Sequence, residues 1–256
     1  MSSTIKPVNN SRLQLLDFIR GIAIGLMFIF HLSFGLNELN LIDVNFSNDY
    51  FWIGFRAIIV FLFLTLVGIG LVLSSHKNKS NTFFQSNTFF QTLLSKRLLL
   101  LFTYMMLITL FSYYVRPQYY VYFGILHLIF ISSLFGRALI KVSAKYLFLV
   151  SLLFLIVGLS VESAQLNHPL IYWLGLGSNP ASSDDFAPLF PWFALVVFGV
   201  ILGQKLSQST EINQSVSQWR AKNWMTKLIC WGGKYSIHLY FFHFQFFYFM
   251  IWLLQL

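Results

Sequence analysis

The apolar residues of the chain gather into long runs, which short polar stretches separate. A helix that crosses a bilayer needs about 20 predominantly apolar residues, and seven runs reach or approach that length. They are Leu15–Leu36, Phe51–Ser74, Leu98–Val115, Tyr119–Phe135, Tyr146–Val161, Pro188–Gln204 and Leu228–Leu254. The third to sixth runs are short, and Gly232 and Gly233 predict a kink or a separate first turn in the last. The pattern predicts an all-α membrane helix bundle of about seven transmembrane helices, built as a single domain over residues 1–256.

The charged residues alternate between the two ends of these runs. Lysine and arginine occupy the N-terminal tail (1–14) and the loops 75–97, 136–145 and 205–227, whereas loops 37–50 and 162–187 hold acidic residues. Arg116 is the only basic residue in the loops of the acidic side. Because short loops rich in lysine and arginine stay on the inner side of a membrane, the N-terminus and the basic loops are predicted to be cytoplasmic. The acidic loops are predicted to be extracytoplasmic.

Composition excludes most other classes of protein. Hydrophobic residues make up 57% of the chain and charged residues 10%, which suits a lipid-facing bundle rather than a soluble domain. The net charge of +9 follows the cytoplasmic loops, so we do not expect nucleic acid as a partner.

The first run carries ionisable residues, and no cleavage site of small residues follows it, so we expect a retained helix rather than a signal peptide. The single cysteine, Cys230, excludes an internal disulfide. A hexad (SNTFFQ) repeats at 80–85 and 86–91, and we expect its Phe pairs at the inner membrane surface.

Two ionisable residues lie on the first predicted helix, where charge is costly and marks a candidate functional site. Arg20 and His31 are 11 residues apart, so at about 100° and 1.5 Å per residue they share a face and differ in depth by about 16 Å. Gly21 and Gly25 permit close approach of another helix to this face. Arg20 is predicted near the cytoplasmic surface and His31 towards the outer one. Asp17 stands three residues before Arg20 and can pair with it.

Other polar residues are predicted at a depth similar to that of His31, roughly 6–16 Å below the outer surface. They are Arg56, His127, Trp192 and His243. Polar side chains from several helices at one depth suggest a shared cavity. Each also has a structural interpretation, because a membrane histidine can hydrogen-bond a neighbouring helix and Arg56 can extend to the surface. His238 lies on a different face from His243, since five residues turn a helix by about 140°, and His168 lies in a loop; neither is expected to be catalytic.

The charge types at the two ends suit transfer of a group across the membrane. An arginine at the cytoplasmic mouth can bind phosphate or carboxylate through two hydrogen bonds. Lys96, Arg97, Arg137 and Lys234 would form a basic rim there, although the positive-inside rule explains most of that charge. At the outer end, His31 would take a proton from an acceptor hydroxyl or amine or become a covalent acyl carrier. Spacing does not distinguish these two roles, so both stay open.

Four strings of residues resemble a known family of membrane enzymes. In the first string, Arg20 is followed by ten residues and then by His31. This spacing resembles the first-helix signature of the large acyltransferase-3 group. All four together are similar to the bacterial heparan-alpha-glucosaminide N-acetyltransferase catalytic-domain family, and they cover the chain in order. The strings are Arg12–Ala23 with Leu26, Met27, Phe30 and His31; Phe123–His127; Asp185–Phe193; and Trp231–Ser236 leading to His243.

The resemblance implies transfer of an acyl group from acyl-CoA through a bacterial cytoplasmic membrane. The expected acyl group is acetyl, and the expected donor is acetyl-CoA. His31, His127 and Asp185 would be catalytic, and Arg20 would lie on the donor side. With this function we expect Arg20, Asp17 and Lys234 to bind the acyl-CoA donor. We expect the acceptor substrate to be bound by Arg56, Trp192 and His243. The acceptor would be a hydroxyl or amino group of a cell-envelope sugar or glycolipid, which loops 37–50 and 162–187 would contact.

Two other functions fit the buried polar residues. A membrane transporter or flippase also lines its path with histidine and arginine, but the sequence shows no inverted repeat and no paired broken helices. A non-catalytic assembly subunit would tolerate the loss of Arg20 and His31. No metal site is expected, because catalytic zinc needs about three clustered ligands. The expected partners are the lipid bilayer and a small-molecule or glycan acceptor, and a homo-oligomer is a candidate assembly.

Overall fold

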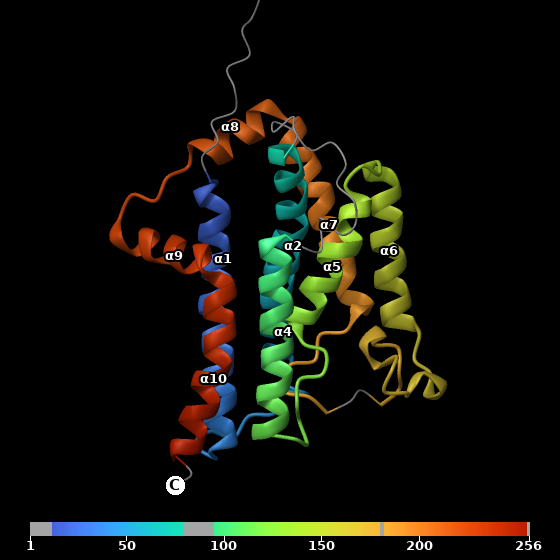
Figure 1. Cartoon of the computed structure of the whole chain (residues 1–256), viewed down its shortest axis with the longest axis vertical. Helices are drawn as coiled ribbons and strands as arrows, with labels where there is room; N and C mark the ends of the chain where they lie inside the picture. The colour runs from blue at the N-terminus through green and yellow to red at the C-terminus, as the bar shows by residue number, and fades with distance from the viewer. Residues whose placement is uncertain (1–11, 79–94, 180–181, 255–256) are drawn as a thin grey trace, which may run out of the picture.

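The computed structural model describes residues 12–78, 95–179 and 182–254, and the repeated hexad lies outside them. The described chain is all-helical, as predicted, apart from one isolated bridge between Ser163 and Gly177. Its α-helices are α1 (Gln14–Glu38), α2 (Tyr50–Asn78), α4 (Lys96–Val115), α5 (Ile125–Leu139), α6 (Ala144–Ser160), α7 (Leu189–Gln208), α8 (Thr210–Gln218), α9 (Trp224–Lys234) and α10 (Ser236–Leu254). Two short 3₁₀ helices, Ala164–Leu166 and Tyr172–Leu174, lie between α6 and α7. Most α-helices run side by side (Figure 1).

Four helices in the described part of the chain are long and apolar enough to cross a membrane. They span Gln14–Glu38, Tyr50–Ser75, Lys96–Val115 and Leu189–Gln208, while the apolar helices α5 and α6 are shorter. The predicted count of about seven spans is therefore not confirmed, although the protein is an integral membrane protein by its apolar helices. The orientation with a cytoplasmic N-terminus stays a prediction.

Glycines bring the central helices α2 and α7 into backbone contact. A Cβ atom added at Gly68 would lie 2.1 Å from the carbonyl oxygen of Val196, and one at Gly199 would lie 2.2 Å from that of Thr65. Only glycine leaves room for two helices this close, which is how membrane helices gain packing energy without a hydrophobic driving force. Around this pair, the buried side chains of α1, α4, α5 and α10 form one apolar core.

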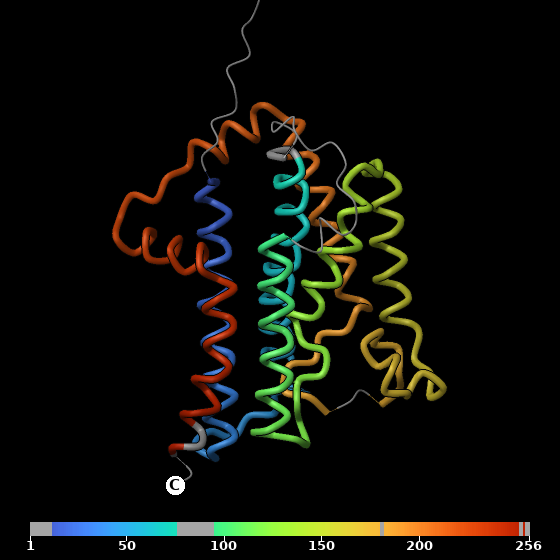
Figure 2. The backbone as a smooth tube through the Cα atoms, viewed as in Figure 1, coloured from blue at the N-terminus to red at the C-terminus, as the bar shows by residue number. Residues whose placement is uncertain are grey.

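The last predicted span, Leu228–Leu254, is in fact two helices, which agrees with the kink or separate turn expected at its start. The chain turns at Tyr235 (φ −103°, ψ 19°), so α9 lies across α1 while α10 runs along it (Figures 1 and 2). Glycine again permits the crossing, because a Cβ at Gly21 would lie 1.9 Å from the Ile229 carbonyl oxygen and one at Gly233 1.7 Å from that of Asp17. Gly25 has no neighbour within 4 Å of its Cβ position, so its predicted part in close helix approach is wrong.

The predicted span Tyr119–Phe135 is also corrected, because its helix begins only at Ile125. The apolar segment before it is irregular and pairs with the chain that precedes α7: Asp184 N–H donates to the Tyr119 carbonyl, and Ala187 N–H donates to that of Phe123. An apolar run has the same composition whether it is helical or buried and extended. Irregular backbone at this depth is tolerated when its polar groups find partners inside the protein.

Candidate functional site

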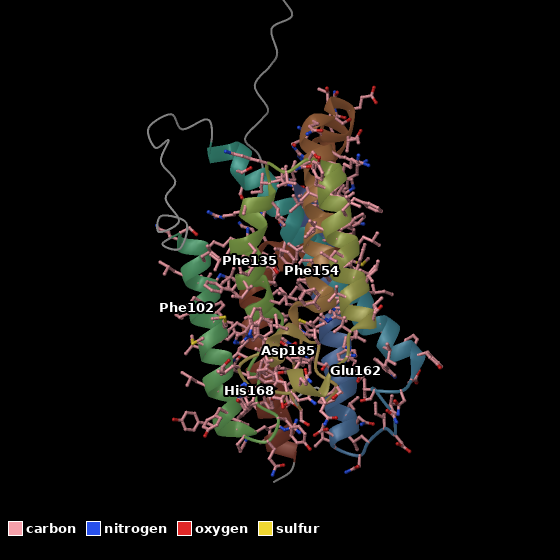
Figure 3. All side chains as sticks on the ribbon, turned by 90° about the vertical axis from the view of Figure 1, so that its right-hand side faces the viewer. Phe102, Phe135, Phe154, Glu162, His168 and Asp185 are labelled. Atoms are coloured by element: carbon pink, nitrogen blue, oxygen red, sulfur yellow. The ribbon has the colours of Figure 1, made fainter. Side chains whose placement is uncertain are left out.

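A small cavity lies between α1, α4, α10 and the chain before α7. Its volume is about 30 Å³, enough for one or two water molecules. Its lining consists of His31, Phe34, Arg116, Asp184, Phe244, Phe247 and Tyr248, and we call it the histidine cavity. In Figure 3 the neighbouring Asp185 lies in the same half of the molecule as Glu162 and His168, the predicted extracytoplasmic half. Of the three predicted catalytic residues, His31, His127 and Asp185, only His31 is among the residues that line this cavity.

The hydrogen bonds of His31 and His243 fix which ring nitrogen is free in each. His31 Nδ1 is 3.0 Å from the carbonyl oxygen of Met27, and His243 Nδ1 bonds the carbonyl oxygen of Tyr240. A carbonyl only accepts, so Nδ1 carries the proton in both rings, and each neutral ring keeps Nε2 as a proton acceptor. The two rings touch edge to face, with centroids 4.7 Å apart at 77°. The structure therefore brings together two bases that lie on α1 and α10.

Asp185 reaches this pair through a tyrosine. The Tyr240 hydroxyl donates to Asp185 Oδ2 at 2.6 Å, and Ile125 N–H, at the start of α5, donates to the same oxygen at 3.1 Å. The Tyr240 ring lies 4.9 Å from that of His243. Asp185 does not line the histidine cavity, so its geometry is that of a residue that positions Tyr240 and, with it, the carbonyl that holds His243.

An ionic cluster closes the predicted outer side of the cavity. Arg116, at the end of α4, binds Glu38 at 2.9 Å and Asp184 at 3.3 Å, and the Tyr248 hydroxyl donates to Asp184. Burial raises the pKa of Asp184, while the hydrogen bond from Tyr248 and the charge of Arg116 oppose that shift. Sequence reasoning missed Arg116, Asp184 and Tyr248 as lining residues. The isolated basic residue among acidic loops was the one available signal for this cluster.

His127 has no free ring nitrogen. Gly124 N–H donates to its Nδ1 at 3.1 Å, so Nε2 carries the proton and donates to Thr109 Oγ1 at 3.1 Å, while the Thr109 hydroxyl donates to the Val121 carbonyl at 2.7 Å. A histidine with both nitrogens engaged caps the start of α5 and joins it to α4. These hydrogen bonds give His127 a structural place, and its predicted catalytic role stays a prediction.

The predicted donor residues meet at the other end of α1. Asp17, whose side chain is 5% exposed, binds Arg20 at 2.8 Å and Arg12 at 2.5 Å. Arg20 and Arg97 converge beside Gly70 of α2, since a Cβ there would lie 3.8 Å from Arg20 Nη2 and 3.9 Å from Arg97 Nη1. We call Arg12, Arg20 and Arg97 the arginine cluster. It joins three cationic side chains with one buried carboxylate, which leaves excess positive charge for an anion.

Three predicted site residues do not join either group. Lys234 is exposed, with Nζ 5.2 Å from the centroid of the Tyr235 ring, and only its carbonyl oxygen reaches the cluster, accepting from Arg12 at 3.3 Å. Arg56 is exposed near the start of α2. Trp192 is partly buried and packs against the apolar core from α7. Within the described ranges, no three His, Cys, Asp or Glu side chains gather as metal ligands.

Comparison with known proteins gives one match. The model of the family described as heparan-alpha-glucosaminide N-acetyltransferase, catalytic, matches residues 12–245, which is nearly the whole chain. The match begins at the arginine cluster and ends just after His243, so it includes both groups of polar residues. The search of curated proteins and the search of solved structures each found no match.

Proposed function

Because the chain belongs to the heparan-alpha-glucosaminide N-acetyltransferase catalytic family, a family of membrane acetyltransferases, we propose that it transfers an acetyl group from acetyl-CoA. The proposed acceptor is a hydroxyl or amino group of a cell-envelope sugar or glycolipid, and the proposed location is the bacterial cytoplasmic membrane. The observation that carries the proposal is the state of His31, a histidine in the cavity wall whose Nε2 is free to accept a proton.

In the proposed reaction, His31 Nε2 takes the proton of the acceptor O–H or N–H group as that oxygen or nitrogen attacks the thioester carbonyl. The new bond to the acyl carbon forms, the C–S bond breaks, and the CoA thiolate leaves and takes up the proton. In a covalent route the same Nε2 would first carry the acyl group. The acceptor would contact Arg116 and Asp184, which line the same cavity as His31.

The spacing along α1 supports acetyl-CoA as the donor. Arg20 and His31 are separated by about 16 Å of helix rise. The pantetheine arm, from the oxygen on the pyrophosphate to the thioester sulfur, is a chain of 13 atoms. Its 12 bonds equal four extended residues, or about 14 Å, and the thioester carbon adds one more bond. The arginine cluster would bind the phosphates through charge-assisted hydrogen bonds while the thioester carbon reaches His31.

The test measures CoA release from acetyl-CoA by the purified protein in nanodiscs, with water or glucosamine as probe acceptor. His31→Gln is expected to lower kcat about 10²- to 10⁴-fold, the range for loss of a general base, and to leave KM for acetyl-CoA unchanged. Arg20→Ala is expected to raise that KM about 10- to 100-fold, because a charged hydrogen bond contributes about 1.5–3 kcal/mol.

The matched controls are His238→Gln on α10, whose ring bonds Tyr104, and Arg220→Ala, an exposed arginine whose side chain bonds nearby carbonyls. Both are expected to behave like the wild type. If the wild-type protein neither binds acetyl-CoA nor releases CoA, the proposed function is wrong, and vesicle flux assays would then test the transporter alternative.

A further inference from the structure

His243 is the most deeply buried histidine of the described chain, and half of its hydrogen-bonding capacity is unused. Its exposed fraction is 1%. Nδ1 bonds the Tyr240 carbonyl, but Nε2 is buried and has no hydrogen-bond partner. Leaving a buried polar atom unpaired costs about 1–3 kcal/mol, and native proteins keep few such atoms. Because an unpaired buried nitrogen destabilises the fold, we looked for a function that uses Nε2 of His243.

The surroundings of His243 leave His31 as the base that it contacts. The two rings pack at 4.7 Å, and both pack against the ring of Phe247, at 6.2 Å for His31 and 6.1 Å for His243. Phe28 and Phe244 cover His243 further, with ring centroids at 5.6 and 5.9 Å. A proton that arrives on His31 therefore meets an apolar wall of aromatic rings on this side, with a single neutral base set in it.

We propose that His243 is a relay residue that shares the proton His31 removes from the acceptor, an inference that rests on the proposed function. The proton moves from the acceptor O–H or N–H to His31 Nε2 and on to His243 Nε2, while the acyl carbon bonds to the acceptor and the C–S bond breaks. The proton then returns through His31 to the CoA thiolate, and both rings end neutral. The pair holds one proton at a time, because two positive rings in contact repel each other.

Sharing the proton has a clear advantage in this place. An imidazolium in a poorly hydrated site is costly. A second imidazole would spread its charge once the two Nε2 atoms share the proton in a hydrogen bond, which low polarity strengthens. The contacts of Tyr240 fix the second ring: its carbonyl holds His243 Nδ1 and its hydroxyl is held by Asp185. The relay thus explains why a carboxylate outside the cavity is linked to its histidines.

The test compares His243→Gln with His238→Gln, a matched control on the same helix whose ring bonds Tyr104 at 2.7 Å. Glutamine keeps a donor for the Tyr240 carbonyl but cannot titrate. With acetyl-CoA and water as the substrates, His243→Gln is expected to lower kcat about 100-fold, within the range for proton-transfer groups, at an unchanged KM for acetyl-CoA. His238→Gln is expected to stay within about threefold of the wild type.

The pH profile of kcat separates a relay from a purely structural role. The wild-type profile is expected to fall at acid pH as the pair takes up its proton, and His243→Gln is expected to shift that limb. The other ionisable groups that face the pair are unchanged in this variant: Asp184, Asp185, Arg116, Tyr240 and Tyr248. A normal limb with only a lower unfolding temperature would mean that His243 has a structural role and would overturn the relay.

The remaining outcomes are also decisive. Wild-type turnover with full activity of His243→Gln overturns the relay and leaves the proposed function standing, whereas absence of turnover in the wild type overturns both. If His243→Gln does not fold, His243→Gly with added free imidazole takes its place. Recovery of CoA release by imidazole, with no change in unfolding temperature, supports the relay, and failure to recover it overturns the relay.

Discussion

Replacing Gly124 by alanine is expected to displace Asp185 and so disturb both stability and turnover. A Cβ at this position would lie 2.3 Å from Asp185 Oδ2 and 2.8 Å from Val121 Cγ1. The backbone itself accepts alanine, because Gly124 has φ −94° and ψ −173°, an extended conformation open to any residue. The collision is therefore with the carboxylate, which must retreat by roughly 1 Å to reach ordinary van der Waals distance.

The magnitude follows from what the carboxylate holds. A retreat of that size stretches the 2.6 Å hydrogen bond from the Tyr240 hydroxyl and the 3.1 Å bond from Ile125 N–H. A hydrogen bond to a charged group contributes about 1.5–3 kcal/mol, and crowding a packed site costs about 1–3 kcal/mol. Because relaxation relieves part of each, we expect a loss of about 2–4 kcal/mol in the free energy of unfolding and about a tenfold lower kcat.

Unfolding by titration with dodecyl sulfate and the rate of CoA release measure the two effects. Gly25→Ala is the control, since nothing lies within 4 Å of its Cβ position. Alanine is favoured over glycine in a helix interior by about 1 kcal/mol, so this variant is expected to be no less stable than the wild type. Tyr240→Phe, introduced into the wild type and into Gly124→Ala, completes a double-mutant cycle. If Gly124→Ala and Tyr240→Phe destabilise additively, or if Gly124→Ala is as stable as Gly25→Ala, the link through Asp185 is refuted.

Two further predictions concern the predicted cytoplasmic end of the bundle. Gly233→Ala would set a Cβ 1.7 Å from the Asp17 carbonyl oxygen, whereas at Gly232 the nearest atom is a flexible leucine methyl at 3.8 Å. We expect Gly233→Ala to lower the free energy of unfolding by about 1–3 kcal/mol and Gly232→Ala to have no such effect; equal values from dodecyl sulfate titrations would contradict the close crossing of α9 and α1. Asp17→Asn leaves the charges of Arg12 and Arg20 unpaired. We expect it to cost about 2–3 kcal/mol, less than the 3–5 kcal/mol of a fully buried pair, because Arg12 is half exposed; a thermal unfolding series that shows no loss would refute this.

Sequence patterns predict well those features that depend on neighbouring residues. The apolar runs predicted six of the nine α-helices that the structure describes, to within four residues at most ends, and the rise and turn of a helix placed Asp17 beside Arg20. What failed depends on contacts between distant residues. The helix expected from Tyr119 begins only at Ile125, because its backbone pairs with residues 184–187, and no local pattern reveals that choice.

The site shows the same division. The depth of His31 and His243 along their helices predicted that they could share a cavity, and the structure places their rings in contact. The occupation of both nitrogens of His127, however, depends on Thr109 and Gly124, and exposure of Arg56 depends on how α2 packs. An ionisable residue inside an apolar run therefore signals a site, but hydrogen-bond partners decide whether it is reactive or structural.

The contact between α1 and α10 has a consequence for the biogenesis of the protein. Membrane chains insert and fold from the N-terminus as they are synthesised, and α10 is the last helix that the structure describes. It supplies His243 and three of the residues that line the cavity, Phe244, Phe247 and Tyr248. Until that helix has inserted, His31 lacks the ring contact of His243, and α9 has no continuation along α1. A half-made chain that lacks α10 thus lacks this wall of the cavity, and the two histidine rings meet only after α10 has been synthesised and inserted.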